Sequence, residues 1–372
     1  MKYLVKSLKI LALFTGVLFF NSCQKAELPV PPISTPSTTT PVVLEPWKMY
    51  RGINISPNIS RTDLEDLAVY HPNVVRINFS ANPLVRKTSP YSFNEDAFAK
   101  LDFVINECER LNMKVIIDPH TSPGFASNFS TTAKDVFWTD TTWHAHLTKV
   151  WVRIAQTYKN RGNIIAGYDL MNEPTARDGF PNTPEASWNQ IFSKLITKIR
   201  AEGDNHTIII ATQQGVGPNG TFLNWTDGIN QIVLPSDTNI VLSPHMYTPT
   251  GFTHQGVTKP ISGPYPGTFN NTYWNKATLD SRLKVLVDYR AAHPDVPIYI
   301  GEFSASRYCG PSGDQYVADL IDLFEKYGFS WSYHSYRQAA DWDAELSNTD
   351  LSNNVRSSTT PRVQLLTTYF KK

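Results

Sequence analysis

Cysteine is scarce in this chain, with three residues (Cys23, Cys108 and Cys309) among 372. Three cysteines cannot form the dense disulfide framework of a small secreted domain, and no cysteine–histidine cluster has the spacing of a metal site. We therefore expect no bound metal. Cys108 and Cys309 could still pair in an oxidising compartment, although Cys108 lies on the apolar side of a predicted helix, which is typical of a small buried hydrophobe.

An excess of charge of one sign is also missing. The chain has 34 basic and 33 acidic residues, so its formal charge is +1 and gives no electrostatic reason to expect nucleic acid as a partner. No glycine-rich phosphate loop follows the first predicted strand, which removes support for a dinucleotide-binding fold. After the N-terminal region, no apolar run is long enough to predict a transmembrane helix.

The N-terminus has the pattern of an export signal. Lys2, Lys6 and Lys9 precede an apolar run from Ile10 to Phe20, which is too short to span a bilayer comfortably. With Cys23 following, the segment resembles a bacterial lipoprotein signal. That resemblance implies removal of residues 1–22, a lipid on Cys23 and an exported protein held at a bacterial membrane, facing the periplasm or the exterior. The alternative is an ordinary signal peptide cut elsewhere.

Residues 23–46 are rich in proline, serine and threonine, which is typical of an extended tether that buries no core. From Trp47 to Lys372, short apolar runs alternate with helix-like segments and no second shift of composition occurs. The predicted strands are Gly52–Ile55, Val74–Phe79, Lys114–Asp118, Ile165–Met171, Thr207–Ala211, Ile240–Pro244, Ile298–Gly301 and Phe329–Tyr333. Helices with one apolar stripe are predicted at Ala97–Leu111, Trp143–Tyr158, Trp188–Ala201 and Gln315–Tyr327.

Eight strands alternating with helices indicate an α/β protein with parallel strands, buried on both faces. We expect residues 47–372 to form a single (β/α)8 barrel, with an open doubly wound sheet as the alternative. In such barrels the C-terminal ends of the strands carry the active site. Polar residues occur at nearly every predicted strand end here, and an ionisable group in a strand is costly unless it is paired.

Two glutamates, Glu173 and Glu302, follow the fourth and seventh predicted strands. Two carboxyl groups across a barrel mouth are what glycoside hydrolysis needs, since one protonates the leaving oxygen while the other attacks the sugar. The sequence resembles glycoside hydrolase family 5 over most of residues 47 to 345. The resemblance is carried by Arg76, His120, Asn172-Glu173-Pro174, His245, Tyr247, Gly301-Glu302-Phe303 and Trp331.

The resemblance implies that Glu173 is the acid/base and Glu302 the nucleophile of a retaining enzyme without a cofactor. Arg76 and Tyr247 are expected to lie beside Glu302 and to favour its ionised form. Asn172 is expected to bind the sugar 2-hydroxyl. The remaining expectations are that His120 and His245 bind hydroxyls or orient the carboxyls, and that Trp331 is the platform beneath the sugar.

The expected substrate is a β-linked polysaccharide or oligosaccharide, with a β-1,4-glucan first and mannan, xylan and other β-glucans left open. Transglycosylation at the same site, and a non-catalytic glycan-binding lipoprotein, are the rival functions. An aldolase would require a lysine at a strand end, and none is present at these eight. We expect the protein to be a monomer.

Overall fold

The computed structural model describes residues 44–125, 136–176, 187–216 and 222–372. The predicted signal segment, Cys23 and the tether up to residue 43 lie outside the described residues. Residues Val42–Lys372 form one unit by their internal contacts. Among the residues described, no helix is both long and apolar enough to cross a membrane.

Eight parallel strands form the central sheet, in the order β12-β13-β1-β2-β3-β4-β6-β9. Their bounds are β1 Arg51–Ile55, β2 Val74–Asn78, β3 Lys114–Asp118, β4 Ile165–Asp169, β6 Ile208–Ala211, β9 Ile240–Ser243, β12 Tyr299–Phe303 and β13 Ser330–Tyr336. Each of the eight predicted strands overlaps one of these. The two edge strands meet through parallel bridges from Leu242 to Ile298 and from Met246 to Phe303, which bring the sheet into a barrel. The predicted (β/α)8 fold is confirmed.

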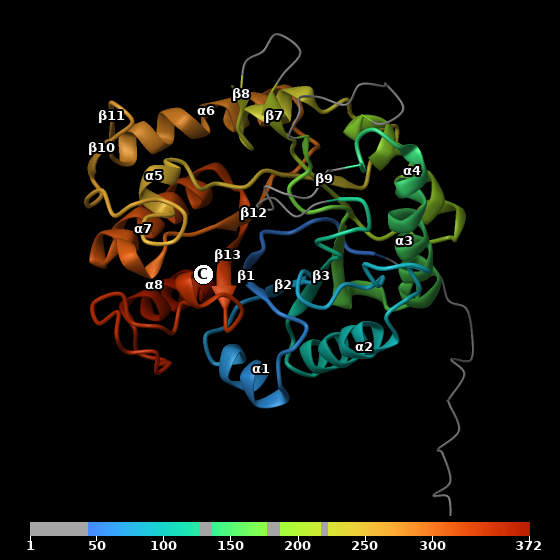
Figure 1. Cartoon of the computed structure of the whole chain (residues 1–372), viewed down its shortest axis with the longest axis horizontal. Helices are drawn as coiled ribbons and strands as arrows, with labels where there is room; N and C mark the ends of the chain where they lie inside the picture. The colour runs from blue at the N-terminus through green and yellow to red at the C-terminus, as the bar shows by residue number, and fades with distance from the viewer. Residues whose placement is uncertain (1–43, 126–135, 177–186, 217–221) are drawn as a thin grey trace, which may run out of the picture. The chain divides into compact units, whose positions relative to one another are not determined.

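Helices surround the strands (Figure 1). They are α1 Arg61–Ala68, α2 Glu95–Arg110, α3 His144–Tyr158, α4 Trp188–Ala201, α5 Thr250–Thr253, α6 Lys276–Ala292, α7 Pro311–Tyr327 and α8 Pro361–Phe370. The four helices predicted from their apolar stripes are present as α2, α3, α4 and α7. Helix α7 starts four residues earlier than predicted, because Pro311 suits the first turn of a helix, where no backbone N–H is needed.

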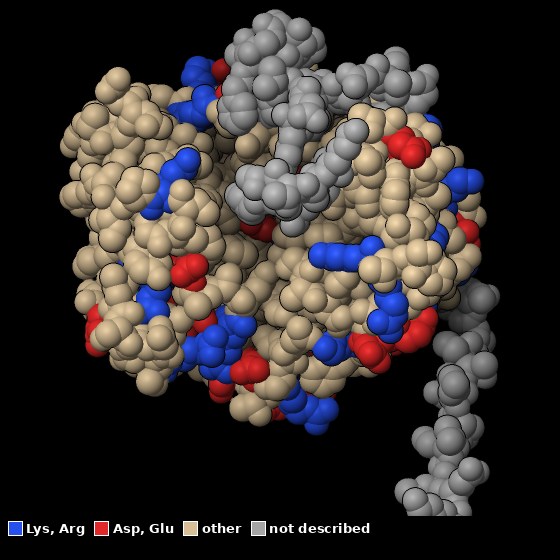
Figure 2. Space-filling view, in the orientation of Figure 1, with Lys and Arg blue, Asp and Glu red and all other residues tan. Residues whose placement is uncertain are grey.

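Short elements decorate the loops between the barrel strands. They are β5 Thr175–Ala176, β7 Gln214–Val216, β8 Phe222–Leu223, the hairpin β10 Gly267–Phe269 with β11 Thr272–Trp274, and 3-10 turns at Thr141–Trp143, Gly162–Ile164, Asp227–Gln231, Arg307–Cys309 and Ala340–Trp342. Figure 2 shows basic and acidic side chains interspersed around the rim of the visible face, as the balanced composition suggests. Cys108 and Cys309 are buried free thiols, so the prediction for Cys108 is confirmed.

Alternation along the strands divides the barrel interior into two levels. In β3, Val115 and Ile117 pack outward in the large core under the helices, whereas Ile116 joins a separate inner cluster. That inner cluster fills one end of the barrel with Tyr50, Val74, Ile116, Ala166, Ile209, Val241 and Tyr299. Further along the same strands, the buried side chains become polar, as with Arg76 and Asp118. The apolar plug therefore supports a layer of buried charge at the carboxyl ends of the strands.

Candidate active site

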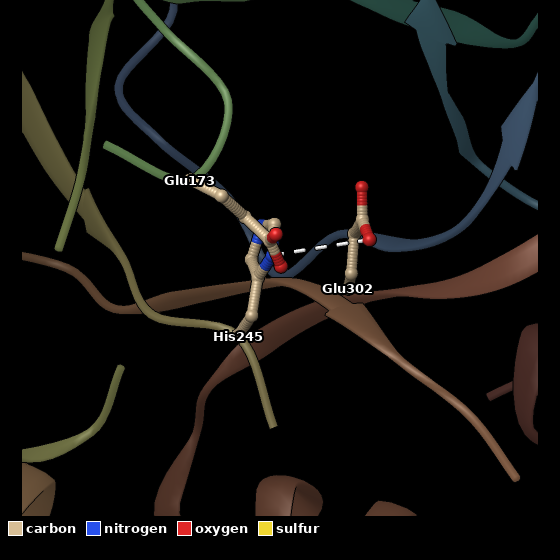
Figure 3. A group of neighbouring side chains, drawn as sticks. All are labelled: Glu173, His245 and Glu302. Atoms are coloured by element: carbon tan, nitrogen blue, oxygen red, sulfur yellow. Dashed lines mark hydrogen bonds and ion pairs between the residues drawn. The ribbon is translucent and has the colours of Figure 1, made fainter. Parts of the chain in front are cut away.

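The two predicted carboxyl residues meet at the carboxyl end of the barrel. Glu173 follows β4, His245 follows β9, and Glu302 lies within β12. One carboxyl oxygen of each glutamate and one ring nitrogen of His245 lie within 4.8 Å of one another. Figure 3 shows these three side chains together, with the His245 ring close to both carboxyl groups. Retaining glycosidases hold their carboxyl groups about 5–5.5 Å apart and inverting enzymes about 6.5–9.5 Å apart, so an oxygen-to-oxygen approach of this size fits the retaining class.

Glu302 is held as an anion by two hydrogen-bond donors. Arg76 Nη1 donates to Oε1 at 2.7 Å, and the Tyr247 hydroxyl donates to Oε2 at 3.0 Å. Burial by itself raises the pKa of Glu302, but the positive charges around it, from His245 and Arg76 in particular, hold that pKa well below its usual range. The predicted placement of Arg76 and Tyr247 beside Glu302 is confirmed.

Arg76 is fully buried and joins several groups at once. Besides Glu302, its guanidinium contacts Asp169 at 2.8 Å, Asp118 at 3.0 Å and the Asn172 side-chain oxygen at 2.9 Å. Burial raises the pKa of Asp169 to about 6 despite the attraction of Arg76. Asp169 was not among the predicted site residues, although a carboxylate ending a buried strand is the same signal that singled out the others.

His245 connects the two glutamates. Its Nδ1 lies 2.9 Å from Glu173 Oε1 and 3.8 Å from Glu302 Oε2. Burial lowers the pKa of His245, but the carboxyl groups of Glu302 and Glu173 outweigh it and raise the pKa. The geometry thus places His245 where it orients the Glu173 carboxyl. The Glu173 backbone has a φ of 43°, a left-handed value that is uncommon for residues other than glycine and that occurs at functional sites.

His120 lies at the edge of this group. Its Nδ1 is 2.7 Å from Asp118 Oδ2, and its Nε2 is 3.3 Å from the Asn78 side-chain nitrogen. With Nδ1 donating to the carboxylate, Nε2 can accept from Asn78. Its ring remains 16% exposed, so a substrate can reach it. Whether His120 binds a hydroxyl stays a prediction.

The prediction for Trp331 is wrong. Its side chain is completely buried, its Nε1 donates to Glu325 in α7 at 3.0 Å, and its ring stacks on Phe370 of α8. The reason is the two-residue period of a strand, which turns Trp331 toward the helices and Ser332 toward the barrel interior, where the Tyr299 hydroxyl donates to Ser332 Oγ. Trp331 is a core residue and cannot lie beneath a sugar.

The same period brings His334 into the site, a residue that the sequence prediction did not assign. His334 Nδ1 lies 4.0 Å from Glu302 Oε2. Burial lowers the pKa of His334 to about 4, so the ring is neutral near neutral pH and adds no positive charge beside Glu302 under those conditions. The two-residue period indicates His334 once the inward direction of Ser332 is known, and that direction comes from the pairing of β13 with β1 and β12.

Glu173, His245 and Glu302 also form the one group among the described residues whose side chains could ligate a metal ion. Glu302 already accepts hydrogen bonds from Arg76 and Tyr247, and Glu173 contacts His245. Because Glu302 is already paired with the guanidinium and Glu173 with His245, this set suits proton transfer and nucleophilic attack better than cation binding.

Comparison with known proteins identifies the family of the chain. The profile of the cellulases, glycosyl hydrolase family 5, matches residues 41–340. The chain belongs to glycosyl hydrolase family 5. Endoglucanase C of Acetivibrio thermocellus is 23% identical over 319 residues, covering 78% of this chain and 87% of that protein. The mannan endo-1,4-beta-mannosidase 7 of Oryza sativa subsp. japonica is 22% identical over 281 residues, covering 66% and 68%.

Solved structures agree on the fold of this family 5 chain. An endoglucanase structure superposes with a TM-score of 0.66 at 22% identity, covering 86% of this chain and 97% of the other. A second structure, of a glycoside hydrolase, gives a TM-score of 0.70 at 20% identity, covering 86% and 99%. Family membership makes the protein an O-glycosyl hydrolase, as the sequence predicted.

Proposed function

We propose that this family 5 enzyme cleaves a β-1,4-glucan by double displacement, with Glu302 as nucleophile and Glu173 as acid/base. The observation that carries the proposal is the approach of the two carboxyl groups to within 4.8 Å around His245. That separation leaves no room for a water molecule beside a bound sugar, so the first attack on the anomeric carbon falls to Glu302.

In the first step, a Glu302 oxygen forms a bond to the anomeric carbon while the bond to the leaving oxygen breaks. Glu173 gives its proton to that oxygen and becomes a carboxylate. Glu302 is suited to attack because its lowered pKa keeps it ionised, and Arg76 and Tyr247 hold its two oxygens in a fixed direction.

In the second step, water attacks the anomeric carbon and the bond to Glu302 breaks. The Glu173 carboxylate takes a proton from that water and so returns to its starting form. His245 contacts Glu173 at 2.9 Å and can hold the carboxyl in place through both states. Trp225 is partly exposed, and its ring lies 5.9 Å from the His245 ring. It can provide an aromatic surface on which a sugar of the leaving part of the polysaccharide stacks.

The glucan assignment is supported by the relatives. Several of them carry the name endoglucanase, and one is a cellodextrinase of Ruminococcus flavefaciens. Mannan is the second candidate, since a mannosidase is also related. Transfer to an acceptor sugar instead of water would use the same two glutamates, and product analysis at high acceptor concentration separates it from hydrolysis.

We also propose that the enzyme is exported and anchored by a lipid on Cys23, with residues 23–46 as the tether. The basic and apolar segments before Cys23 support this. Because Glu173, Glu302 and their partners all come from one chain, a monomer contains a complete site. Labelling of expressing bacteria with a palmitate analogue should mark the wild type and leave Cys23→Ser unmarked; equal labelling would contradict the anchor.

The test of the catalytic proposal is the configuration of the first product, followed by NMR on defined β-glucan and β-mannan oligosaccharides. We expect the β anomer to appear first and the α anomer to arise later by mutarotation. Glu302→Gln should abolish turnover, whereas Glu107→Gln, on the outer helix α2, should not. Initial formation of the α anomer would contradict a covalent sugar intermediate.

A further inference from the structure

The chain that leaves β13 forms one wall of the site beside the nucleophile. The His334 ring lies 5.8 Å from the Trp342 ring, and the Trp342 ring lies 5.5 Å from that of His254. His254 in turn lies 5.2 Å from Tyr247, the donor to Glu302. We call the segment from His334 to Trp342, together with His254, the β13 wall.

Polar atoms on this wall lack partners. Nδ1 of His334, Nε1 of Trp342 and Oε1 of Gln338 are buried and have no hydrogen-bond partner among the described residues. Buried polar atoms of folded proteins are nearly always paired, so these three atoms call for a partner that the described residues do not supply. The three side chains themselves remain partly exposed. A group that enters the cleft could therefore pair with them after a small side-chain adjustment.

The wall also offers an aromatic surface of the kind that the sequence analysis had assigned to Trp331. Trp342 is partly exposed, whereas Trp331 is completely buried against α7 and α8. Aromatic rings provide a large flat surface, and an indole adds one N–H donor. Trp342 therefore combines the two properties that a pyranose ring requires, an apolar face and a partner for a hydroxyl.

We propose that His334 and Trp342 bind the sugar that becomes attached to Glu302, with Trp342 against its apolar side and His334 at one of its hydroxyls. This inference rests on the proposed function, because it places a glycone beside Glu302. His334 Nδ1 lies 4.0 Å from Oε2 of the nucleophile Glu302. The contacts make the β13 wall a determinant of specificity at the cleavage point.

The charge of the wall narrows the sugar to a neutral pyranose. Burial lowers the pKa of both His254 and His334 to about 4, so neither is a cation near neutral pH. Arg337, on the same segment, is engaged by Asp63, Asp66 and Glu345. Arg76 contacts three carboxylates. A uronic acid would thus find no available cation on this wall to balance its carboxylate.

The test uses 2,4-dinitrophenyl β-cellobioside, whose leaving group needs little protonation, so that glycone contacts dominate the rate. Trp342→Phe keeps a ring and loses the N–H, and Trp331→Phe makes the same change in the core. We expect His334→Ala and Trp342→Phe each to lower kcat/KM by about tenfold, the worth of one well-placed hydrogen bond. Trp342→Ala should lower it further, and Trp331→Phe should leave it near the wild-type value.

Deoxy analogues of the same substrate distinguish contact from distortion. With the wild-type enzyme, an analogue that lacks the glycone hydroxyl bound by His334 should have a kcat/KM about tenfold below that of the parent substrate. With His334→Ala, removing the same hydroxyl should cause no further loss of kcat/KM. Three results would overturn the proposal. They are a loss of kcat/KM by the same factor on every analogue, an unchanged kcat/KM in both His334→Ala and Trp342→Phe, and a loss in Trp331→Phe equal to that in the wall variants. Failure of the proposed function is a separate result, in which the wild type hydrolyses neither the β-cellobioside nor a β-mannobioside.

Discussion

Removing the charge of Arg76 tests the buried ionic layer most severely. Arg76→Met keeps a similar stem but leaves Asp118, Asp169 and Glu302 without their shared cation. All four side chains are 7% exposed or less. Breaking a buried ion pair by removing one partner costs about 3–5 kcal/mol, because the remaining charge is left uncompensated. We expect a loss of this size in the free energy of unfolding at pH 7.

The loss should shrink in mild acid, and its sign follows from the pKa values. In the wild type the pKa of Glu302 is below the ordinary 4.5, so its ionisation stabilises the fold above pH 4.5 and this contribution is lost as pH falls through the lowered pKa. Without Arg76, the pKa of Glu302 should rise toward its ordinary value, because His245 is then the main charge left to oppose burial, and the pKa of Asp169, which burial already raises to about 6, should rise further. Ionised carboxyls then destabilise the variant at pH 7, and protonation relieves this cost as pH falls.

The assay is urea-induced unfolding of the wild type and Arg76→Met at pH 7 and pH 5. The dependence of the free energy of unfolding on urea concentration should be the same for the two proteins, so that their values can be compared. Arg51→Met is the control, because it breaks a partly exposed ion pair between Arg51 at the start of β1 and Glu325 of α7. Its loss in the free energy of unfolding should be smaller at both pH values. A cost below about 1 kcal/mol at pH 7, within the range of an exposed salt bridge, would refute the reasoning. So would a cost that does not fall between pH 7 and pH 5.

Two further predictions concern single groups. Tyr247→Phe removes the 3.0 Å hydrogen bond to Glu302 Oε2, so kcat/KM should fall by about tenfold. The acidic limb of the pH profile of kcat/KM should also move to higher pH, since the nucleophile loses a donor that favours its anion. An acidic limb that does not move would argue against direct contact. Cys108 and Cys309 are buried, and burial raises the pKa of both thiols. A thiol reagent should therefore label neither cysteine in the native enzyme and both after denaturation, as measured by mass. Rapid labelling of the native enzyme would contradict their burial.

The sequence was sufficient for the barrel because its information there is local and repeated. Each predicted strand combines apolar residues for both faces, and each predicted helix has one apolar stripe, so the alternation indicates parallel strands. Helix α6 escaped the stripe analysis, although Leu279, Leu283 and Leu286 are buried along it. Charged residues between these leucines dilute the apolar pattern, and only the packing of the barrel shows which side is inward.

The candidate site was predictable where chemistry and strand ends coincide. Glu173 and Glu302 follow apolar runs, and the closed barrel brings their carboxyl groups together. The misplacement of Trp331 shows the limit, because a shift of one residue along a strand reverses the direction of a side chain. Strand boundaries from sequence are uncertain by more than one residue, so the inward direction of His334 required the pairing of β13 with β1 and β12.

The covalent sugar on Glu302 is the central claim, and trapping it is the most direct test. A 2-deoxy-2-fluoro aryl β-cellobioside slows release of the sugar, so the intact enzyme should gain the mass of one fluorinated disaccharide unit. Peptide mapping should place that mass on Glu302, and Glu302→Gln should gain none. Label on another residue, or turnover of the unmodified substrate by an enzyme that never gains the mass, would contradict the account.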